Sequence, residues 1–172
     1  MFASADKGRD KMKEAEVKAL LVDPINNSPV ILLKDRNSSK AMPIWIGEAE
    51  AMSIALELQG QTFPRPLSHD LMKRLLEALG GTLERVVISG LKEGTFYATL
   101  YVRTSTGEVK EIDARPSDSV ALALRTRSPI YIADEVFEQS AIESPFAEEE
   151  RFHEFVDREL KLSEFRKRAQ SS

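Results

Sequence analysis

Three short segments of the sequence place charged side chains where a strand or loop passes into a predicted helix. In the first segment, Glu48 and Glu50 follow Gly47 and stand in the first turn of such a helix. Acidic residues at a helix N-terminus stabilise the helix by about 0.3–1 kcal/mol through its dipole, and this structural role is one explanation for the pair. The other explanation is chemical, because carboxylates can bind a metal ion or transfer a proton.

The second segment is Arg65–Asp70. Its arginine stands before a proline, which forces the arginine into extended geometry, so that the guanidinium projects from a stiff linker. His69 and Asp70 follow in the first turn of a helix and point in different directions, so they are not automatically a dyad. His69 is nevertheless the best candidate for a general base or a neutral metal ligand in this part of the chain. A capping segment with a solvated histidine is the structural alternative.

The third segment is Asp113–Asp118, in which a predicted strand ends and a helix begins at Pro116. Functional residues often lie at junctions of this kind. Asp113 and Asp118 bracket Arg115, so the arginine is available to bind an anion while the two acids hold a cation. The structural alternative is that Arg115 pairs with both acids and locks the turn.

Together, these residue types suit the hydrolysis of a phosphodiester bond. That reaction needs neutralised phosphate charge, an activated water molecule and a stabilised leaving oxygen, and oxygen-rich sites hold Mg²⁺ or Mn²⁺ for this purpose. In this hypothesis Arg65 and Arg115 bind the phosphate, and His69 orients or deprotonates the water. The predicted catalytic residues are His69, Asp70 and Glu50, and the predicted ligands of the divalent metal are Asp113, Asp118 and Glu50.

The composition excludes several other kinds of site. The 172 residues include no cysteine, so a disulfide scaffold, a thiolate zinc site and a cysteine nucleophile are excluded. Only two histidines are present, which excludes a three-histidine metal site. With 24 basic and 28 acidic residues the net charge is −4, which is the wrong sign for the capture of nucleic acid by an overall basic field.

The sequence also shows no targeting signal. Its first residues are polar, and no run approaches the roughly 18 apolar residues that a membrane span needs. The absence of cysteine and of a secretory signal favours a cytoplasmic protein without a membrane partner.

The elements that must position these residues are those of an α+β domain, predicted over residues 13–142. Alternating and apolar runs predict a strand pair over residues 14–34, joined by a turn rich in asparagine. Short glycine turns predict a three-stranded meander over residues 82–114. The remaining elements are a short strand at 42–47, helices at 48–58, from an N-cap at Ser68, and at 116–127, and a strand at 129–133.

Two predicted helices carry apolar stripes. The helix that begins near Ser68 carries leucines at positions 71, 75, 76 and 79. The highly charged tail at residues 143–172 carries a second stripe, which predicts a helix that packs on the domain or on a neighbouring subunit. A disordered tail or a partner-binding helix is the alternative. The stripe in the tail predicts a homo-oligomer, with a dimer favoured. Residues 1–12 are expected to be a flexible N-terminal extension.

Three blocks of the sequence resemble the signature blocks of the bifunctional nuclease domain family. They are Pro43–Ala51, Arg65–Leu71 and Asp113–Ala123, in the family's order and with its spacing. Shorter matches at Arg85–Ile88 and Gly94–Ala98 extend the resemblance over about Val17 to Ala141. It implies an α+β domain that acts on DNA and RNA. By position it carries functional roles to Glu50, His69, Asp70, Asp113, Arg115 and Asp118, with Arg65 and Glu48 behind them.

The leading hypothesis is a metal-assisted nuclease that cleaves DNA and RNA with low sequence specificity. The alternative is a non-catalytic oligomeric module that binds a small anionic ligand or a protein partner, in which the acid–arginine junctions are turn locks and subunit contacts. The two hypotheses differ in whether Asp113, Asp118 and Glu50 lie close enough to share one metal ion, whose ligand distances are about 2.0–2.6 Å.

Overall fold

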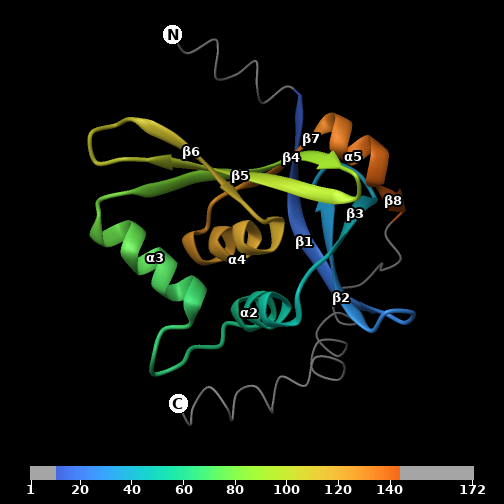
Figure 1. Ribbon diagram of the computed structural model, residues 1–172, viewed down its shortest axis with the longest axis horizontal. Coiled ribbons are helices and arrows are strands. Elements are labelled where there is room, and N and C mark those ends of the chain that lie inside the picture. Colours follow the sequence, from blue (N-terminus) through green and yellow to red (C-terminus); the bar gives the residue numbers. More distant parts are fainter. Residues whose placement is uncertain (1–10, 144–172) are drawn as a thin grey trace.

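The computed structural model describes residues 11–143, which form one mixed sheet with helices packed on it (Figure 1). The predicted α+β class is therefore confirmed. The strands are β1 (Met12–Asp23), β2 (Ser28–Asp35), β3 (Lys40–Trp45), β4 (Thr82–Lys92), β5 (Thr95–Arg103), β6 (Val109–Ala114), β7 (Ile130–Ala133) and β8 (Ile142–Glu143). The helices are α2 (Glu48–Leu58), α3 (Ser68–Ala78), α4 (Pro116–Thr126) and α5 (Asp134–Ser140).

The sheet joins two antiparallel units through one short strand. The strand order is β6-β5-β4-β7-β1-β2-β3-β8. The β1–β2 hairpin and the β4–β5–β6 meander pair as predicted. Between them lies β7, which runs parallel to β4 and antiparallel to β1. The residues that end β3 and β6 therefore belong to different units, and the helices that follow these strands must bring them together.

Helices α2 and α4 follow β3 and β6, and they pack against each other beneath the sheet (Figure 1). Both are rich in small and branched apolar residues that are buried, so the two backbones approach closely. Pro116 occupies the first turn of α4, where its missing N–H removes no helical hydrogen bond. The two helices bury side chains in one hydrophobic core cluster, among them Ala51, Ile54, Ala55, Val120, Ala121 and Ala123.

Helix α3 differs from the prediction at two points. Its N-cap is Leu67, and Ser68 is the first helical residue, because the carboxylate of Asp70 accepts the Leu67 N–H at 2.9 Å. The leucine stripe is not covered by residues 11–143. Leu76 packs partly on the core, whereas Leu71, Met72, Leu75 and Leu79 are exposed.

The two ends of the chain lie partly outside the described residues, so the predictions about them are only partly tested. Helix α5 and strand β8 lie beyond the last predicted strand and were not expected. Of the predicted N-terminal extension, Met12 pairs with Ala133 in the sheet and the carbonyl of Lys11 accepts the N–H of Asp134. Residues 1–10 and the predicted C-terminal helix lie outside the described part of the chain. None of the helices in residues 11–143 has the length and apolar content needed to cross a membrane.

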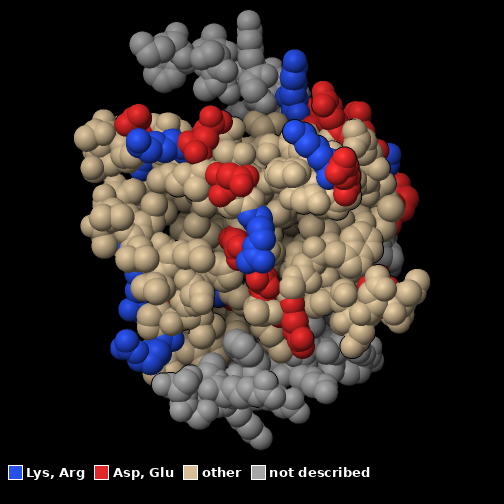
Figure 2. Space-filling model, in the orientation of Figure 1, with Lys and Arg blue, Asp and Glu red and all other residues tan. Residues whose placement is uncertain are grey.

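Charged side chains do not form a broad basic area on the face shown in Figure 2. Most of them lie near the edges of this face, and uncharged residues fill the space between. A compact group of basic and acidic side chains lies at the centre, over α4 as it is placed in Figure 1. Any attraction for an anion on this face must therefore be local.

Candidate functional site

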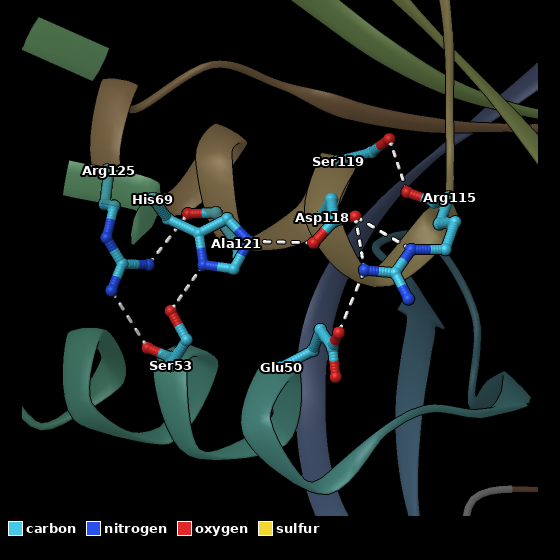
Figure 3. Close-up of polar contacts among 8 residues, drawn as sticks. All are labelled: Glu50, Ser53, His69, Arg115, Asp118, Ser119, Ala121 and Arg125. Carbon is cyan, nitrogen blue, oxygen red and sulfur yellow. Dashed lines mark hydrogen bonds and ion pairs between the residues drawn. The ribbon is translucent and has the colours of Figure 1, made fainter. Parts of the chain in front are cut away.

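Arg115 connects the N-termini of α2 and α4 (Figure 3). It is the N-cap residue of α4. Its Nη2 group donates to Oε1 of Glu50 at 2.9 Å and lies 2.8 Å from Oδ2 of Asp118, to which Nε also donates at 2.9 Å. One guanidinium thus joins a carboxylate on its own helix to a carboxylate on the neighbouring helix.

The guanidinium is far more exposed than the acids that hold it. The side chain of Arg115 is 66% exposed, whereas those of Glu50 and Asp118 are 18% and 25% exposed. Hydrogen bonds to Asp118 and Glu50, together with the charge of Asp118, raise the pKa of Arg115, so the group stays cationic. Its Nη1 has no hydrogen-bond partner among residues 11–143 and is available to an incoming anion (Figure 3).

Glu50 owes its position to a glycine. Its second oxygen, Oε2, lies over Gly47 at the N-cap of α2, where a Cβ atom would overlap with it. Glycine leaves room for the carboxylate to fold back toward the helix N-terminus, and there the helix dipole favours its negative charge.

His69 is buried behind Asp118 and has no open ring nitrogen. Its Nε2 lies 2.9 Å from Oδ1 of Asp118, and its Nδ1 lies 2.7 Å from Oγ of Ser53 (Figure 3). Only 5% of the residue is exposed. Because Asp118 accepts from Arg115 as a carboxylate, Nε2 of His69 carries the hydrogen that is donated to it, and Nδ1 exchanges a hydrogen bond with the Ser53 hydroxyl. The prediction that His69 deprotonates water stays a prediction, but in this arrangement the ring contacts protein on both sides.

The charge of Asp118 is stabilised from two directions. Burial alone would raise the pKa of this carboxyl, but the hydrogen bonds from His69 and Arg115 and the positive charge of Arg115 outweigh it. The pKa of Asp118 therefore lies below its ordinary value. Asp118 is the centre of a continuous chain of hydrogen bonds that runs from buried Ser53 to exposed Arg115 and on to Glu50.

Asp70 faces away from His69 and binds a buried arginine that the sequence analysis missed. Arg125 donates from Nε to Oδ1 of Asp70 at 2.7 Å, from Nη1 to the carbonyl of Ala121 at 3.0 Å and from Nη2 to the carbonyl of Ser53 at 3.1 Å. The side chain of Arg125 is only 4% exposed. The one signal in the sequence was a charged residue on an otherwise apolar helix face, and it did not reveal the partner.

The predicted metal ligands are not assembled in the described part of the chain. Glu50 and Asp118 converge, but they do so on Arg115, whereas Asp113 is exposed on edge strand β6 and makes no ion pair with residues 11–143. No group of three or more Asp, Glu or His side chains in this range could hold a metal ion. The residues as placed do not fit the predicted site, because a cationic guanidinium already occupies the space between two of its three ligands.

Two other predicted residues lie apart from this cluster. Arg65 is exposed in the segment between α2 and α3 and makes no hydrogen bond or ion pair with the described residues. Glu48 is exposed at the start of α2 and likewise has no such partner within residues 11–143. The structure therefore brings together Glu50, His69, Arg115 and Asp118, with Asp70 on the far side of His69.

A cavity of about 400 Å³ adjoins Arg115. It lies between the N-terminus of α2, the N-terminus of α4 and the turn between β4 and β5. Its walls combine the exposed arginine with aromatic rings and backbone, which the sequence analysis did not single out. The lining residues are Ser28, Ile44, Trp45, Ile46, Gly47, Gly94, Thr95, Phe96, Arg115, Pro116 and Ser117.

The lowered pKa values of Asp70 and Asp118 predict how stability depends on pH. For Asp70, burial would raise the pKa, but the hydrogen bonds from Arg125 and the Leu67 N–H lower it below the ordinary value. A carboxyl whose pKa is depressed by folding stabilises the protein above its unfolded-state pKa of about 4 and loses that contribution as pH falls through the folded-state pKa. We expect the denaturant midpoint to fall below about pH 4, as followed by circular dichroism.

Amide variants identify the carboxyl groups that are responsible for the pH dependence of stability. Asp70→Asn and Asp118→Asn should each be less stable than the wild type at pH 6 and should show a shallower loss of stability between pH 5 and pH 3. Glu48→Gln is the matched control, because Glu48 has no partner in the described structure. A profile for the Asp118 variant that runs parallel to that of the wild type would contradict the assigned role of this carboxylate.

The chain is similar in sequence to a protein family and to several known proteins. A sequence profile of the bifunctional nuclease domain matches residues 31–145. An uncharacterized protein of Mycobacterium tuberculosis (strain H37Rv) is 43% identical over 158 residues, which cover 85% of this chain and 94% of that protein. Bifunctional nuclease 1 of Oryza sativa subsp. indica is 25% identical over 114 residues, or 65% of this chain and 34% of the plant protein. Bifunctional nuclease 1 of Arabidopsis thaliana is 22% identical over 107 residues, or 60% and 33%.

Proposed function

The chain belongs to the bifunctional nuclease domain family, and we propose that it hydrolyses phosphodiester bonds in DNA and RNA at the cavity beside Arg115. The observation that supports this proposal most strongly is the exposed guanidinium of Arg115, held between two less exposed carboxylates at the edge of a cavity. The names of the plant relatives supply the reaction class. The geometry supplies the residues that this chain would use.

The phosphate would bind where positive charge is concentrated. Arg115 offers the free Nη1 group, and the N-termini of α2 and α4 border the same cavity through Gly47 and Ser117. Backbone N–H groups at helix N-termini bind anions and carry the positive end of the helix dipole. Together these groups would neutralise the phosphate locally, which an acidic chain with a net charge of −4 needs.

Glu50 is the group best placed to accept a proton from the attacking water. It is partly exposed, and one of its oxygens is fixed by Arg115, so a phosphate bound to Arg115 would lie close to the carboxylate. The water oxygen would then form a bond to phosphorus, the bond to the leaving oxygen would break, and the leaving oxygen would take a proton from solvent. His69 would act through Asp118 by holding the carboxylate that orients Arg115.

Dependence on Mg²⁺ or Mn²⁺, which the acidic residue types suggested, stays a prediction. The steps proposed above use only Arg115, Glu50 and the residues that hold them, since the described carboxylates do not form the three-ligand set. A divalent ion, when bound, would supply further neutralisation of the phosphate charge. Asp113 and Arg65 lie outside the proposed centre, and their predicted roles in metal and phosphate binding are tested by the same assay.

Replacement of Glu50 by glutamine tests the proposed reaction. The amide oxygen can still accept from Arg115, but it cannot take a proton from water, so cleavage of supercoiled plasmid and of labelled RNA should slow by roughly 10²–10⁴-fold. The rates are measured with Mg²⁺, with Mn²⁺ and with EDTA. Loss of cleavage in EDTA would establish the metal requirement, and unchanged cleavage would exclude it.

The matched control is Glu84→Gln. Glu84 also accepts from an arginine, but that arginine is Arg103, whereas Glu50 accepts from Arg115 beside the cavity. This variant should cleave like the wild type. Equal cleavage by all three proteins would indicate a contaminating nuclease and would contradict the proposal. Binding of phosphate without any cleavage would favour the non-catalytic alternative.

Association of two copies is a separate proposal. The exposed apolar residues of α3 (Leu71, Met72 and Leu75) and of its C-cap (Leu79) form an apolar face of the kind found in subunit contacts. The described chain therefore offers a surface for the homo-oligomer that the sequence analysis expected, in addition to the stripe in residues 143–172, which lies outside the described range.

A further inference from the structure

Trp45 is the only tryptophan of the chain, and it is exposed at the rim of the cavity. It is the last residue of β3, and 54% of its surface is open to solvent. A large aromatic ring left open in this way does not contribute its full area to the core, so its burial alone does not explain it.

The edge of the indole ring is fixed. Its Nε1–H donates to Oδ2 of Asp23 at 3.0 Å, and the other oxygen of Asp23 accepts the Ile25 N–H at 2.9 Å. These contacts lower the pKa of the Asp23 carboxyl, so it remains a charged acceptor. The ring is therefore held in place from the β1–β2 turn, which reduces the entropy that a ligand would lose on stacking against it.

A second aromatic ring and a cation share the cavity with Trp45. Phe96 lines it from β5, and Arg115 lines it from the start of α4. A volume of about 400 Å³ lies within the range of small-ligand sites and is large enough for one nucleotide. The site thus offers flat apolar surfaces for a base and a guanidinium for the neighbouring phosphate.

This combination suits an unpaired base better than a paired one. Base stacking on aromatic side chains contributes roughly 1–3 kcal/mol per base and does not depend on sequence. Inside a duplex the faces of the bases are already stacked, and removing one costs a few kcal/mol. Because the net charge of −4 gives little non-specific attraction for a duplex backbone, contacts with individual bases carry more of the affinity.

We propose that Trp45, together with Phe96, stacks an unpaired base next to the phosphate bound by Arg115, so that the preferred substrate is single-stranded nucleic acid. This inference rests on the proposed function, because it assigns a substrate class to the same cavity. It predicts low sequence specificity, since every base offers a face for stacking.

The emission of Trp45 tests the inference directly, because no other tryptophan contributes to it. The probe is a short oligothymidylate with phosphorothioate linkages, which resist cleavage, compared with a phosphorothioate duplex of the same length at low salt. The single strand should quench the emission at concentrations at least about tenfold lower than the duplex. Equal quenching by the two probes would overturn the inference.

Variants provide a second readout that does not use the tryptophan. By fluorescence anisotropy of a labelled oligothymidylate, Trp45→Ala should bind roughly 5- to 150-fold more weakly, and Trp45→Phe should bind with intermediate affinity. Tyr97→Ala is the matched control, because Tyr97 is also an exposed aromatic residue but follows Phe96 on β5, so it points to the opposite face and does not line the cavity. Equal weakening by the Tyr97 and Trp45 variants would overturn the inference.

Failure of the inference is distinguishable from failure of the proposed function. If Trp45→Ala cleaved and bound single strands like the wild type while Glu50→Gln abolished cleavage, stacking would be overturned and the proposed reaction would stand. If no Glu50-dependent cleavage occurred but single strands still quenched Trp45 selectively, the binding of unpaired bases would stand and the reaction would be overturned.

Discussion

Replacement of Arg115 by alanine is expected to reduce the cleavage of DNA and RNA by two or more orders of magnitude without unfolding the protein. Among residues 11–143, Arg115 is the one cation that contacts both Glu50 and Asp118, and its Nη1 has no partner in that range. In enzymes of phosphoryl transfer, removal of an arginine that contacts the transferred group costs about 10³–10⁵ in rate, and removal of one oxyanion-hole donor costs about 10²–10³. The side chain is 66% exposed, so its removal leaves the core intact.

Loss of the Arg115 guanidinium should also raise the pKa of Asp118. Without the guanidinium, Glu50 and Asp118 become neighbouring like charges, and the pKa of Asp118 loses two of the influences that lower it. Activity that remains in Arg115→Ala should therefore have a pH profile shifted toward higher pH, whereas a general defect in folding would lower the rate equally at every pH. Cleavage rates between pH 5 and pH 9 distinguish the two explanations.

Two further variants separate the geometry of Arg115 from its charge and from the general effect of removing an arginine. Arg115→Lys keeps the charge but loses the planar fork that joins two carboxylates, so its rate should lie between those of the wild type and the alanine variant. Arg103→Ala is the matched control, because Arg103 is an exposed arginine that pairs with Glu84 away from the cavity. The proposed role of Arg115 would be untenable if Arg103→Ala and Arg115→Ala lost activity to the same extent.

The elements that local patterns define were predicted well. Helix α2 begins at Glu48 and ends at Leu58, as the spacing of Ala51, Ile54, Ala55 and Leu58 indicated. The hairpin and the meander follow from short turns, which depend on residues close in sequence. Helix α3 shows the limit of this reasoning, since Leu71, Leu75 and Leu79 have helical spacing and still face solvent in residues 11–143.

The candidate site was predicted only where its contacts are local. Asp118 lies three residues from Arg115, so the turn between them could be foreseen from the helix geometry. The structural alternative paired Arg115 with Asp113 as its second acid, whereas the structure pairs it with Glu50, 65 residues away in sequence. That contact exists because α2 and α4 pack against each other, and no property of either segment alone specifies which helix its neighbour is. The burial of His69 depends on the same packing.

Arg125 is expected to contribute more to stability than any other polar residue of this region. It holds the carboxylate of Asp70 on α3 and the carbonyl of Ser53 on α2, while its own backbone belongs to α4. Arg125→Ala removes three hydrogen bonds and leaves a partly buried carboxylate without its partner. Breaking a fully buried ion pair typically costs about 3–5 kcal/mol. Because the side chain of Asp70 is 34% exposed, the free energy of unfolding in urea should fall by an amount near the lower end of that range.

A double-mutant cycle separates the ion pair from the packing of the side chain. Asp70→Ala alone should also be destabilising, and the double variant should be less unstable than the sum of the two single variants, because the second substitution removes the charge that the first left unpaired. Arg74→Ala is the control, since Arg74 is an exposed arginine of α3 and its loss should change stability by no more than about 0.5 kcal/mol. Additive effects of the Asp70 and Arg125 variants would show that the pair is not coupled.

Arg125→Ala should also impair the candidate site, through a chain of hydrogen bonds. Arg125 binds the backbone of Ser53, whose side chain bonds His69, and His69 in turn holds the Asp118 carboxylate that orients Arg115. At a temperature where Arg125→Ala remains folded by circular dichroism, its cleavage rate should fall at least about tenfold through a lower kcat, because the displaced Arg115 stabilises the transition state less well. A folded variant with wild-type kcat would show that α2 and α4 keep their spacing without Arg125, and that the hydrogen bonds of the site, not the buried arginine, set the position of Arg115.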